Sequence, residues 1–342
     1  MNHKTMPGEK ISDLYLLLLL FLWKLKNVYC KPMQSRFASP NVPGTGEGFF
    51  FGTRNKKEFF LSLLTSYQSE VSISLEADEI KTSIDQGSVD DSFRFIFPLG
   101  KEYWLRQISN APEYFHTAID RWIAHNPPGS ERWYDLRMSA IRIINWIAGF
   151  HLFSDHSSIN EKFRRRFFKT IFLHGSWFYI FSKSRFNSNI EKLLLLTALQ
   201  FTGTLFLNSK KGDTWLRRSI KLIDTAILHD DPAIEPYSFA NRIEFYTLSY
   251  ILSEKTNISR STEIKKKLHT LYYSLSNVEG EPEIERQLFR YTITEDIPID
   301  KGLMTVGAIL CNDPELKKRY PHFSEDALWL LGAEGFESFR II

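Results

Sequence analysis

WYDLRMSAIRIINWIAGFHLF, residues 133–153, is the stretch that decides the fold class. Its apolar side chains recur three and four positions apart, at Ala140, Ile143, Ile144 and Ile147, which places them on one face of an α-helix. A strand would instead alternate apolar and polar residues with a period of two. The segment therefore predicts a long amphipathic helix.

The helical pattern continues on both sides of this stretch. PEYFHTAIDRWIAHN, residues 112–126, begins with proline and an acidic residue, as a first helical turn prefers, and stops at Pro127-Pro128-Gly129. Further helices are predicted over residues 160–182, 189–207, 214–229, 238–252, 262–275, 301–311 and 325–339. Several are apolar on more than one face, for example LLLLTALQFTGTLF, which indicates burial on two sides.

Successive helices of this length with short links are typical of an α/α-barrel-like fold. We therefore expect a mainly α protein, an incomplete (α/α) toroid in which antiparallel helix pairs bury a common face. No sequence repeat of fixed period is present, which disfavours a regular solenoid. An irregular helical bundle is the alternative.

The N-terminal part of the chain has a different character. LYLLLLLFLW, Leu14–Trp23, would span roughly 15 Å as a helix at about 1.5 Å per residue, half of a bilayer core. Residues 11–23 are interpreted as a buried helix, peripheral to a membrane, with a signal or anchor as the alternative. Residues 31–57 are rich in Pro, Gly and Ser. We therefore expect an N-terminal helix and irregular linker over 1–57.

The remaining chain, residues 58–342, is expected to form the toroid domain, with its core at about 100–340. Residues 58–100 are ambiguous: EFFLSLLTSY has helical spacing, whereas VSISLEA and FRFIFPL alternate like short strands. Both a cytoplasmic and a periplasmic location of the protein are compatible with the sequence.

Composition narrows the classes of function. Forty-three basic and 40 acidic residues give a net charge of +3, which is too balanced to indicate nucleic-acid binding. The chain is 15% aromatic, which suits a packed core and also an open carbohydrate cleft. Its two cysteines exclude a disulfide framework. The nine histidines form no H-x-H or H-E-x-x-H arrangement, so neither a metal nor a cofactor is predicted.

Several motifs occur in an order that points to a known family. The first are AIDRWIAHNP (118–127), Trp133 and RIINWI (142–147). They are followed by SRFNSNIEKLLLLTALQFTG (184–203), TWLRRSIKLIDTAILHDDPAIEPYSFANRIEFY (214–246) and DPELKKRYPHFSEDALWLLGAEGFESF (313–339). In order and spacing they resemble the helical toroid domain of heparinase II/III-type polysaccharide lyases, across about residues 100–340. The β-sandwich that completes those enzymes has no counterpart in this sequence.

The resemblance implies β-elimination on an acidic, uronate-containing polysaccharide. Such chemistry needs a group that neutralises the uronate carboxylate, a base for the adjacent proton and an acid for the leaving oxygen. The position of the family asparagine falls on Asn189 or Asn187, with a helix-capping role as the alternative. Glu235 keeps part of the family's acidic motif. The predicted catalytic residues are therefore Asn189, Glu235 and Tyr237.

The chain departs from the family at its tyrosine-histidine position. That position falls on Ala240-Asn241 or on Asn241-Arg242, so no phenol occupies it. Tyr237 or Tyr246 would have to substitute from nearby, and packing roles for both are the alternative. The missing tyrosine and sandwich favour weak or absent catalysis, because a catalytic set acts as a unit.

Four further residues are predicted to contact the sugar or its carboxylate. They are Arg142, Asn145, Trp146 and Arg242, of which the first three lie in the helix that opens this section. For Arg142 and Asn145, a hydrogen bond between helices is the alternative.

Three functions follow as hypotheses. The chain is a heparinase II/III-like lyase of acidic polysaccharide, a non-catalytic truncated toroid that binds such a glycan, or a helical interaction scaffold in polysaccharide biosynthesis. The expected partners are an acidic polysaccharide and either a separate β-sandwich half or a second copy of the chain. An uncovered face of the toroid would be apolar and would favour self-association.

Overall fold

The computed structural model describes residues 91–96, 99, 100, 103, 110–154, 156–184, 186, 189–207, 209–232, 239–277, 299–322, 327, 330, 331, 335 and 338–342. The predictions for the N-terminal helix, for the linker over 31–57 and for Glu235 and Tyr237 lie outside these residues. Within them every regular element is a helix, so the prediction of a mainly α protein is confirmed. The helices are α5 (Ala111–His125), α6 (Glu131–Tyr134), α7 (Leu136–Phe153), α8 (Glu161–Phe181), α9 (Asn189–Leu205), α10 (Lys210–His229), α11 (Phe239–Lys255), α12 (Thr262–Ser276), α13 (Ile299–Cys311) and α14 (Pro314–Arg319).

Polar side chains set several of the helix starts. The Asp135 carboxylate accepts a hydrogen bond from the Met138 backbone N–H at 2.9 Å, which caps α7. Ser209 caps α10 in the same way, accepting from the Gly212 backbone N–H at 3.0 Å. Each cap satisfies a donor that the first turn leaves without a helical partner. Because of the Ser209 cap, α10 begins at Lys210, four residues before its predicted start.

Two kinds of helix alternate along the middle of the chain. In α7, α9 and α11, nearly every residue after the first turn is buried, including many serines and threonines. In α8, α10 and α12, buried residues form a stripe and the opposite face is exposed. Helices of the first kind are therefore surrounded by other elements, whereas helices of the second kind cover them from outside.

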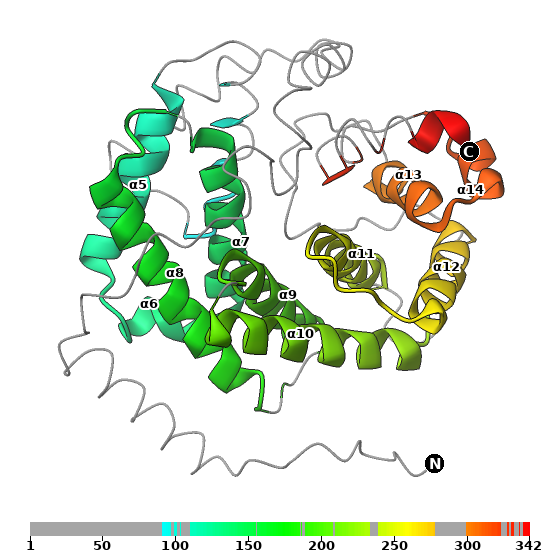
Figure 1. The fold of residues 1–342 in the computed structure, drawn as a ribbon, viewed down its shortest axis with the longest axis horizontal. Coiled ribbons are helices and arrows are strands. Elements are labelled where there is room, and N and C mark those ends of the chain that lie inside the picture. Colours follow the sequence, from blue (N-terminus) through cyan, green and yellow to red (C-terminus); the bar gives the residue numbers. More distant parts are fainter. Residues whose placement is uncertain are drawn as a thin grey trace.

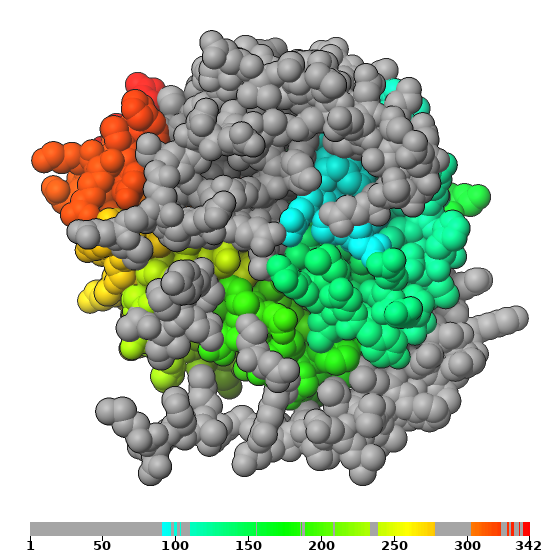
Figure 2. All heavy atoms as spheres, turned by 180° about the vertical axis from the view of Figure 1, so that it is seen from behind, coloured from blue at the N-terminus to red at the C-terminus, as the bar shows by residue number. Residues whose placement is uncertain are grey.

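Helix α9 lies at the centre of this arrangement. It contacts α7, α8, α10 and α11, and α10 in turn contacts α12 (Figure 1). The segments that contain α5–α7 and α13–α14 lie at opposite sides of the molecule in both views (Figures 1 and 2). At Gly203 in α9 and Gly212 in α10 the two segments pack so closely that an added Cβ atom would meet the backbone of the other segment.

The strand-like pattern of FRFIFPL does not produce a strand. Its described residues are turn at Arg94 and Phe95 and helix at Ile96 and Leu99. The Ile96 N–H donates to the Phe93 carbonyl at 3.2 Å, and the Leu99 N–H donates to the Phe95 carbonyl at 3.1 Å. These bonds span three and four residues, as in helical turns. Phe93, Ile96 and Leu99 are all buried in the helical core, so burial rather than pairing accounts for the apolar pattern.

The C-terminal region differs in detail from the prediction. Helix α14 was missed, although Asp313 caps it by accepting from the backbone N–H groups of Glu315 and Leu316. The helix predicted over 325–339 falls largely on residues that the structure leaves undescribed. Among the described residues, no helix combines the length and the apolar character that crossing a bilayer requires.

Candidate functional site

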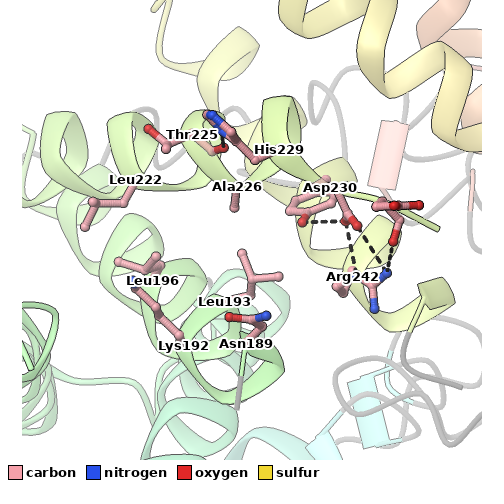
Figure 3. A pocket seen from close by; sticks show the side chains of 12 residues that line it. Asn189, Lys192, Leu193, Leu196, Leu222, Thr225, Ala226, His229, Asp230 and Arg242 are labelled. Carbon is pink, nitrogen blue, oxygen red and sulfur yellow. Dashed lines mark hydrogen bonds and ion pairs between the residues drawn. The ribbon is translucent and has the colours of Figure 1, made fainter. Parts of the chain in front are cut away.

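A pocket opens between α9, α10 and the first turns of α11 (Figure 3). Its volume is about 190 Å³, below the roughly 300–1,000 Å³ of sites that enclose drug-sized ligands. The pocket therefore suits one small group, such as a single sugar residue. It is lined by Asn189, Lys192, Leu193, Leu196, Leu222, Thr225, Ala226, His229, Asp230, Asp231, Arg242 and Tyr246.

The helical repeat explains why these residues meet. On α9 the lining residues stand at positions 189, 192, 193 and 196, and on α10 at 222, 225, 226 and 229. Both sets follow the i, i+3, i+4, i+7 spacing that defines one face of a helix. Leucine and alanine side chains of both helices form an apolar floor, with Lys192 and Thr225 beside it, while Asp230 and Arg242 stand together at one end of the pocket (Figure 3).

A buried carboxylate organises one end of the pocket. Asp230 accepts two hydrogen bonds from Arg242, from Nε to Oδ2 and from Nη2 to Oδ1, each 3.1 Å long (Figure 3). The two side chains are each only 5% exposed. This fork-shaped pairing neutralises both charges and fixes the planes of both groups.

Tyr246 completes this arrangement. Its phenol donates a hydrogen bond of 2.7 Å to Asp230 Oδ2. Burial, and then the hydrogen bond to this carboxylate, raise the pKa of Tyr246 well above its ordinary value. The phenol is thus held in its protonated form, which can donate a proton or a hydrogen bond but is unsuited to act as a base.

Lys192 supplies a different kind of charge. It is half-buried on the wall of the pocket, and no hydrogen bond or ion pair joins its amine to a described residue. Burial, followed by repulsion from Arg218, lowers the pKa of Lys192 below the ordinary value of a lysine. An anion that entered the pocket would offset both effects, because it would supply the missing counter-charge.

Asn189 and His229 occupy the more exposed parts of the lining. Asn189 is the first residue of α9, so its amide lies beside the positive end of that helix. His229 Nδ1 lies 2.8 Å from the Thr225 carbonyl oxygen. Since a carbonyl only accepts, Nδ1 carries the proton and Nε2 of the neutral ring is an acceptor.

The pocket brings together three residues that the sequence had singled out separately, one of them Tyr246, the alternative source of a phenol. Asn189, predicted to act in catalysis, and Arg242, predicted to bind substrate, both line it. Arg242 is engaged by Asp230, so its charge is already balanced. Glu235 and Tyr237 belong to the undescribed segment 233–238, which joins two parts of the lining.

Arg142, Asn145 and Trp146 lie in the protein interior, away from this pocket, and are at most 1% exposed. The Asn145 amide donates to the Ser92 carbonyl at 2.8 Å. Arg142 lies 4.0 Å from the centre of the Trp122 ring and donates to Ser139 Oγ at 2.8 Å. Burial lowers the pKa of Arg142 to about 10.

These contacts fix segment 91–92 and the neighbouring aromatic core to α7. The three residues were predicted to contact sugar because they belong to the RIINWI motif of the family resemblance, and in a helix they stand three and four positions apart. That spacing defines a common face of the helix but does not say whether the face meets solvent or another part of the chain. The role of Arg142, Asn145 and Trp146 in sugar binding stays a prediction, and none of the three lines the described pocket.

Sequence reasoning missed most of the lining, including its lysine, histidine and two aspartates, Lys192, His229, Asp230 and Asp231. A usable signal was present in HDD at residues 229–231, where charged groups stand at the end of a predicted helix. Arg242 and Tyr246, four residues apart, were a second signal, because such residues share a helix face. Within the described residues, no three His, Cys, Asp or Glu side chains are placed to hold a metal ion.

Comparisons with protein-family models, with curated proteins and with solved structures found no match to this chain. The structure therefore defines the class as a mainly α-helical protein with a small pocket that is lined by apolar and polar residues.

Proposed function

We propose that this protein binds an acidic, uronate-containing polysaccharide and that the pocket between α9, α10 and α11 holds one uronate residue. The observation that carries the proposal is Lys192, a half-buried ammonium group on the pocket wall without a carboxylate partner among the described residues. A uronate carboxylate supplies that partner, and the Asn189 amide is available for a further hydrogen bond to it.

The rest of the lining suits a sugar ring. Thr225 and Nε2 of His229 offer polar groups to hydroxyls. The apolar floor of leucine and alanine matches the C–H face of a pyranose. The volume of about 190 Å³ fits one such ring rather than an extended ligand.

The helix arrangement supports the same proposal at the level of the fold. Buried helices α7, α9 and α11 alternate in sequence with the one-sided helices α8, α10 and α12. An inner layer and an outer layer connected in this order are what antiparallel pairs of an incomplete α/α toroid require. We include that architecture in the proposal.

Binding is the function that the pocket supports best, and β-elimination is the second candidate. Elimination requires a base, and Tyr246 is unsuited because its phenol donates to Asp230. Lys192 is the candidate base in that scheme, in which it does not pair with the uronate carboxylate, because burial and repulsion from Arg218 lower its pKa in the direction of the neutral amine. In that scheme Asn189 stabilises the charge that develops on the carboxylate.

Calorimetric titration with oligomers of galacturonate, glucuronate and mannuronate tests the proposal. We expect binding of at least one series and at least about a tenfold loss of affinity in Lys192→Met, equivalent to about 1.4 kcal/mol. Lys266→Met on the exposed face of α12 is the matched control and should bind like the wild type. Absence of binding in every series, or equal affinity of Lys192→Met and the wild type, would overturn the proposal.

The two candidate functions separate in a second measurement. Cleavage by β-elimination creates an unsaturated uronate, which raises the ultraviolet absorbance of the bound oligomer. Binding without such a rise supports a non-catalytic glycan-binding protein. A rise that Lys192→Met abolishes, while Lys266→Met retains it, supports the lyase.

A further inference from the structure

A row of three cations continues from the pocket across α9 and α10 toward the end of α8. Lys192 forms the pocket wall, Arg218 lies near enough to lower its pKa, and Lys183 follows the last turn of α8. Arg218 and the pocket residue Leu222 stand four positions apart on α10, so they share one face of that helix. The cation row therefore joins the pocket rather than forming a separate patch.

The ring of Tyr179 holds two of these cations. Lys183 Nζ lies 4.9 Å from the ring centroid, and Arg218 Cζ lies 5.6 Å from it. Arg218 Nε also donates to Ser182 Oγ at 2.9 Å. The ring and the hydroxyl position the guanidinium, while no described residue accepts from its two terminal nitrogens.

Most carboxylates of this region form ion pairs with arginines outside the cation row. Asp213 pairs with Arg217 at 2.8 Å, and Asp224 pairs with Arg260 at 3.1 Å. Asp230, at the far end of the pocket, pairs with Arg242. Glu191 is exposed on α9, next to Lys192 in sequence. The cation row has no ion pair of 4.0 Å or less among the described residues, and its mutual repulsion would be relieved by an anionic ligand.

We propose that Lys183 and Arg218 form a second anionic subsite, so that the ligand is an oligouronate whose neighbouring carboxylate lies on this row. The inference rests on the proposed function, because the pocket must hold the first residue of the same chain. The terminal nitrogens of Arg218 present a planar fork that matches a carboxylate, and Lys183 adds a point charge beside it. One sugar residue fills the pocket and the next extends over the end of α8.

The test compares a uronate monosaccharide with its di-, tri- and tetramers by calorimetric titration of the full chain. We expect affinity to rise from the monomer to the longer oligomers. Arg218→Gln should lower oligomer affinity at least about fivefold, the upper range for a solvent-accessible ion pair, and leave monomer affinity unchanged. Lys221→Gln, on the exposed face of the next turn of α10, is the matched control and should match the wild type throughout.

The outcomes separate this inference from the function on which it rests. Wild-type oligomer affinity in Arg218→Gln, together with binding that depends on Lys192, would overturn the second subsite and leave the proposed function standing. Equal losses for monomer and oligomer would also overturn it, since they would place Arg218 in the first subsite. No binding of any uronate would overturn both.

Further measurements distinguish loss of binding from loss of folding and identify the ligand group. The melting temperature of Arg218→Gln should lie within about 2 °C of the wild type, which would show that the variant is folded. Lys183→Gln is the second variant and should show the same length-dependent loss. Sulfated oligomers with reduced carboxyl groups should bind more weakly than oligouronates, and equal or tighter binding would overturn the assignment to carboxylates.

Discussion

Gly203→Ala should destabilise the protein, because the contact between α9 and α10 leaves no room for a methyl group. A Cβ atom at Gly203 would lie 2.6 Å from the Leu216 backbone nitrogen, 2.9 Å from Leu216 Cα and 3.0 Å from the Gly212 carbonyl oxygen. Ordinary van der Waals contacts of a Cβ begin at 3.4 Å, so α10 would have to move by several tenths of an ångström. These neighbours are backbone atoms, which cannot rotate away as a side chain can.

Two effects of opposite sign determine the magnitude. Overpacking of this kind costs about 1–3 kcal/mol. Alanine in a helix is favoured over glycine by at most about 1 kcal/mol, which offsets part of the cost. A clash with backbone at 2.6 Å places the overpacking cost in the upper part of its range, about 2–3 kcal/mol, so the net destabilisation is about 1–2 kcal/mol. At about 2–4 °C per kcal/mol, the melting temperature should fall by several degrees.

Thermal unfolding followed by circular dichroism at fixed pH measures this difference. Thr214→Ala, at an exposed position early in α10, is the matched control and should change stability by less than about 0.5 kcal/mol. A melting temperature of Gly203→Ala equal to or above that of the wild type would refute the close packing of α9 against α10.

Three further predictions concern buried charges and a helix cap. Burial lowers the pKa of His151 to about 3 and that of His174 well below its ordinary value, so both rings are neutral in the fold and take up protons on unfolding. This contribution to stability is therefore present above about pH 6.5 and declines toward acid. The free energies of unfolding from urea titrations at pH 6.5 and pH 5 should differ by about 1.6 kcal/mol per histidine, and a total difference below about 1 kcal/mol would contradict neutral burial. Asp230→Asn should cost about 3–5 kcal/mol in chemical denaturation because it removes the buried charge that Asp230 presents to Arg242, and a cost below 1 kcal/mol would speak against the pair. Ser209→Ala should cost about 1 kcal/mol through loss of the α10 cap, whereas Ser209→Asp should retain it; equal melting of the two variants would count against capping.

Much of the helical content could be predicted because it depends on local pattern. The predicted helix over 262–275 and the observed α12 agree to one residue, and the predicted stretch over 160–182 contains α8. Each has one apolar stripe and a polar N-cap, so residues close in sequence specify both its face and its start. The missed start of α10 depended on recognising Ser209 as a cap.

The candidate site was predictable only in part. Asn189 and Arg242 attracted attention through motif order, and the structure brings both to one pocket. Nothing in the sequence was a reason to select Lys192, because a lysine on a helix is usually solvated. Its burial and its proximity to Arg218 depend on how α10 packs against α9. The Asp230 pairing was equally hidden, since it joins a residue after α10 to one on α11.

The sequence by itself determined that this protein is built of amphipathic and doubly apolar helices, since the spacing of apolar residues is a local property. Only the tertiary structure decided which polar residues face a pocket and which face the core. The segment RIINWI contains Arg142, Asn145 and Trp146, and its spacing suits a sugar-binding face equally well; packing against segment 91–92 and Trp122 buries all three. Helical periodicity specifies a face, but the environment of that face depends on contacts between residues far apart in the chain.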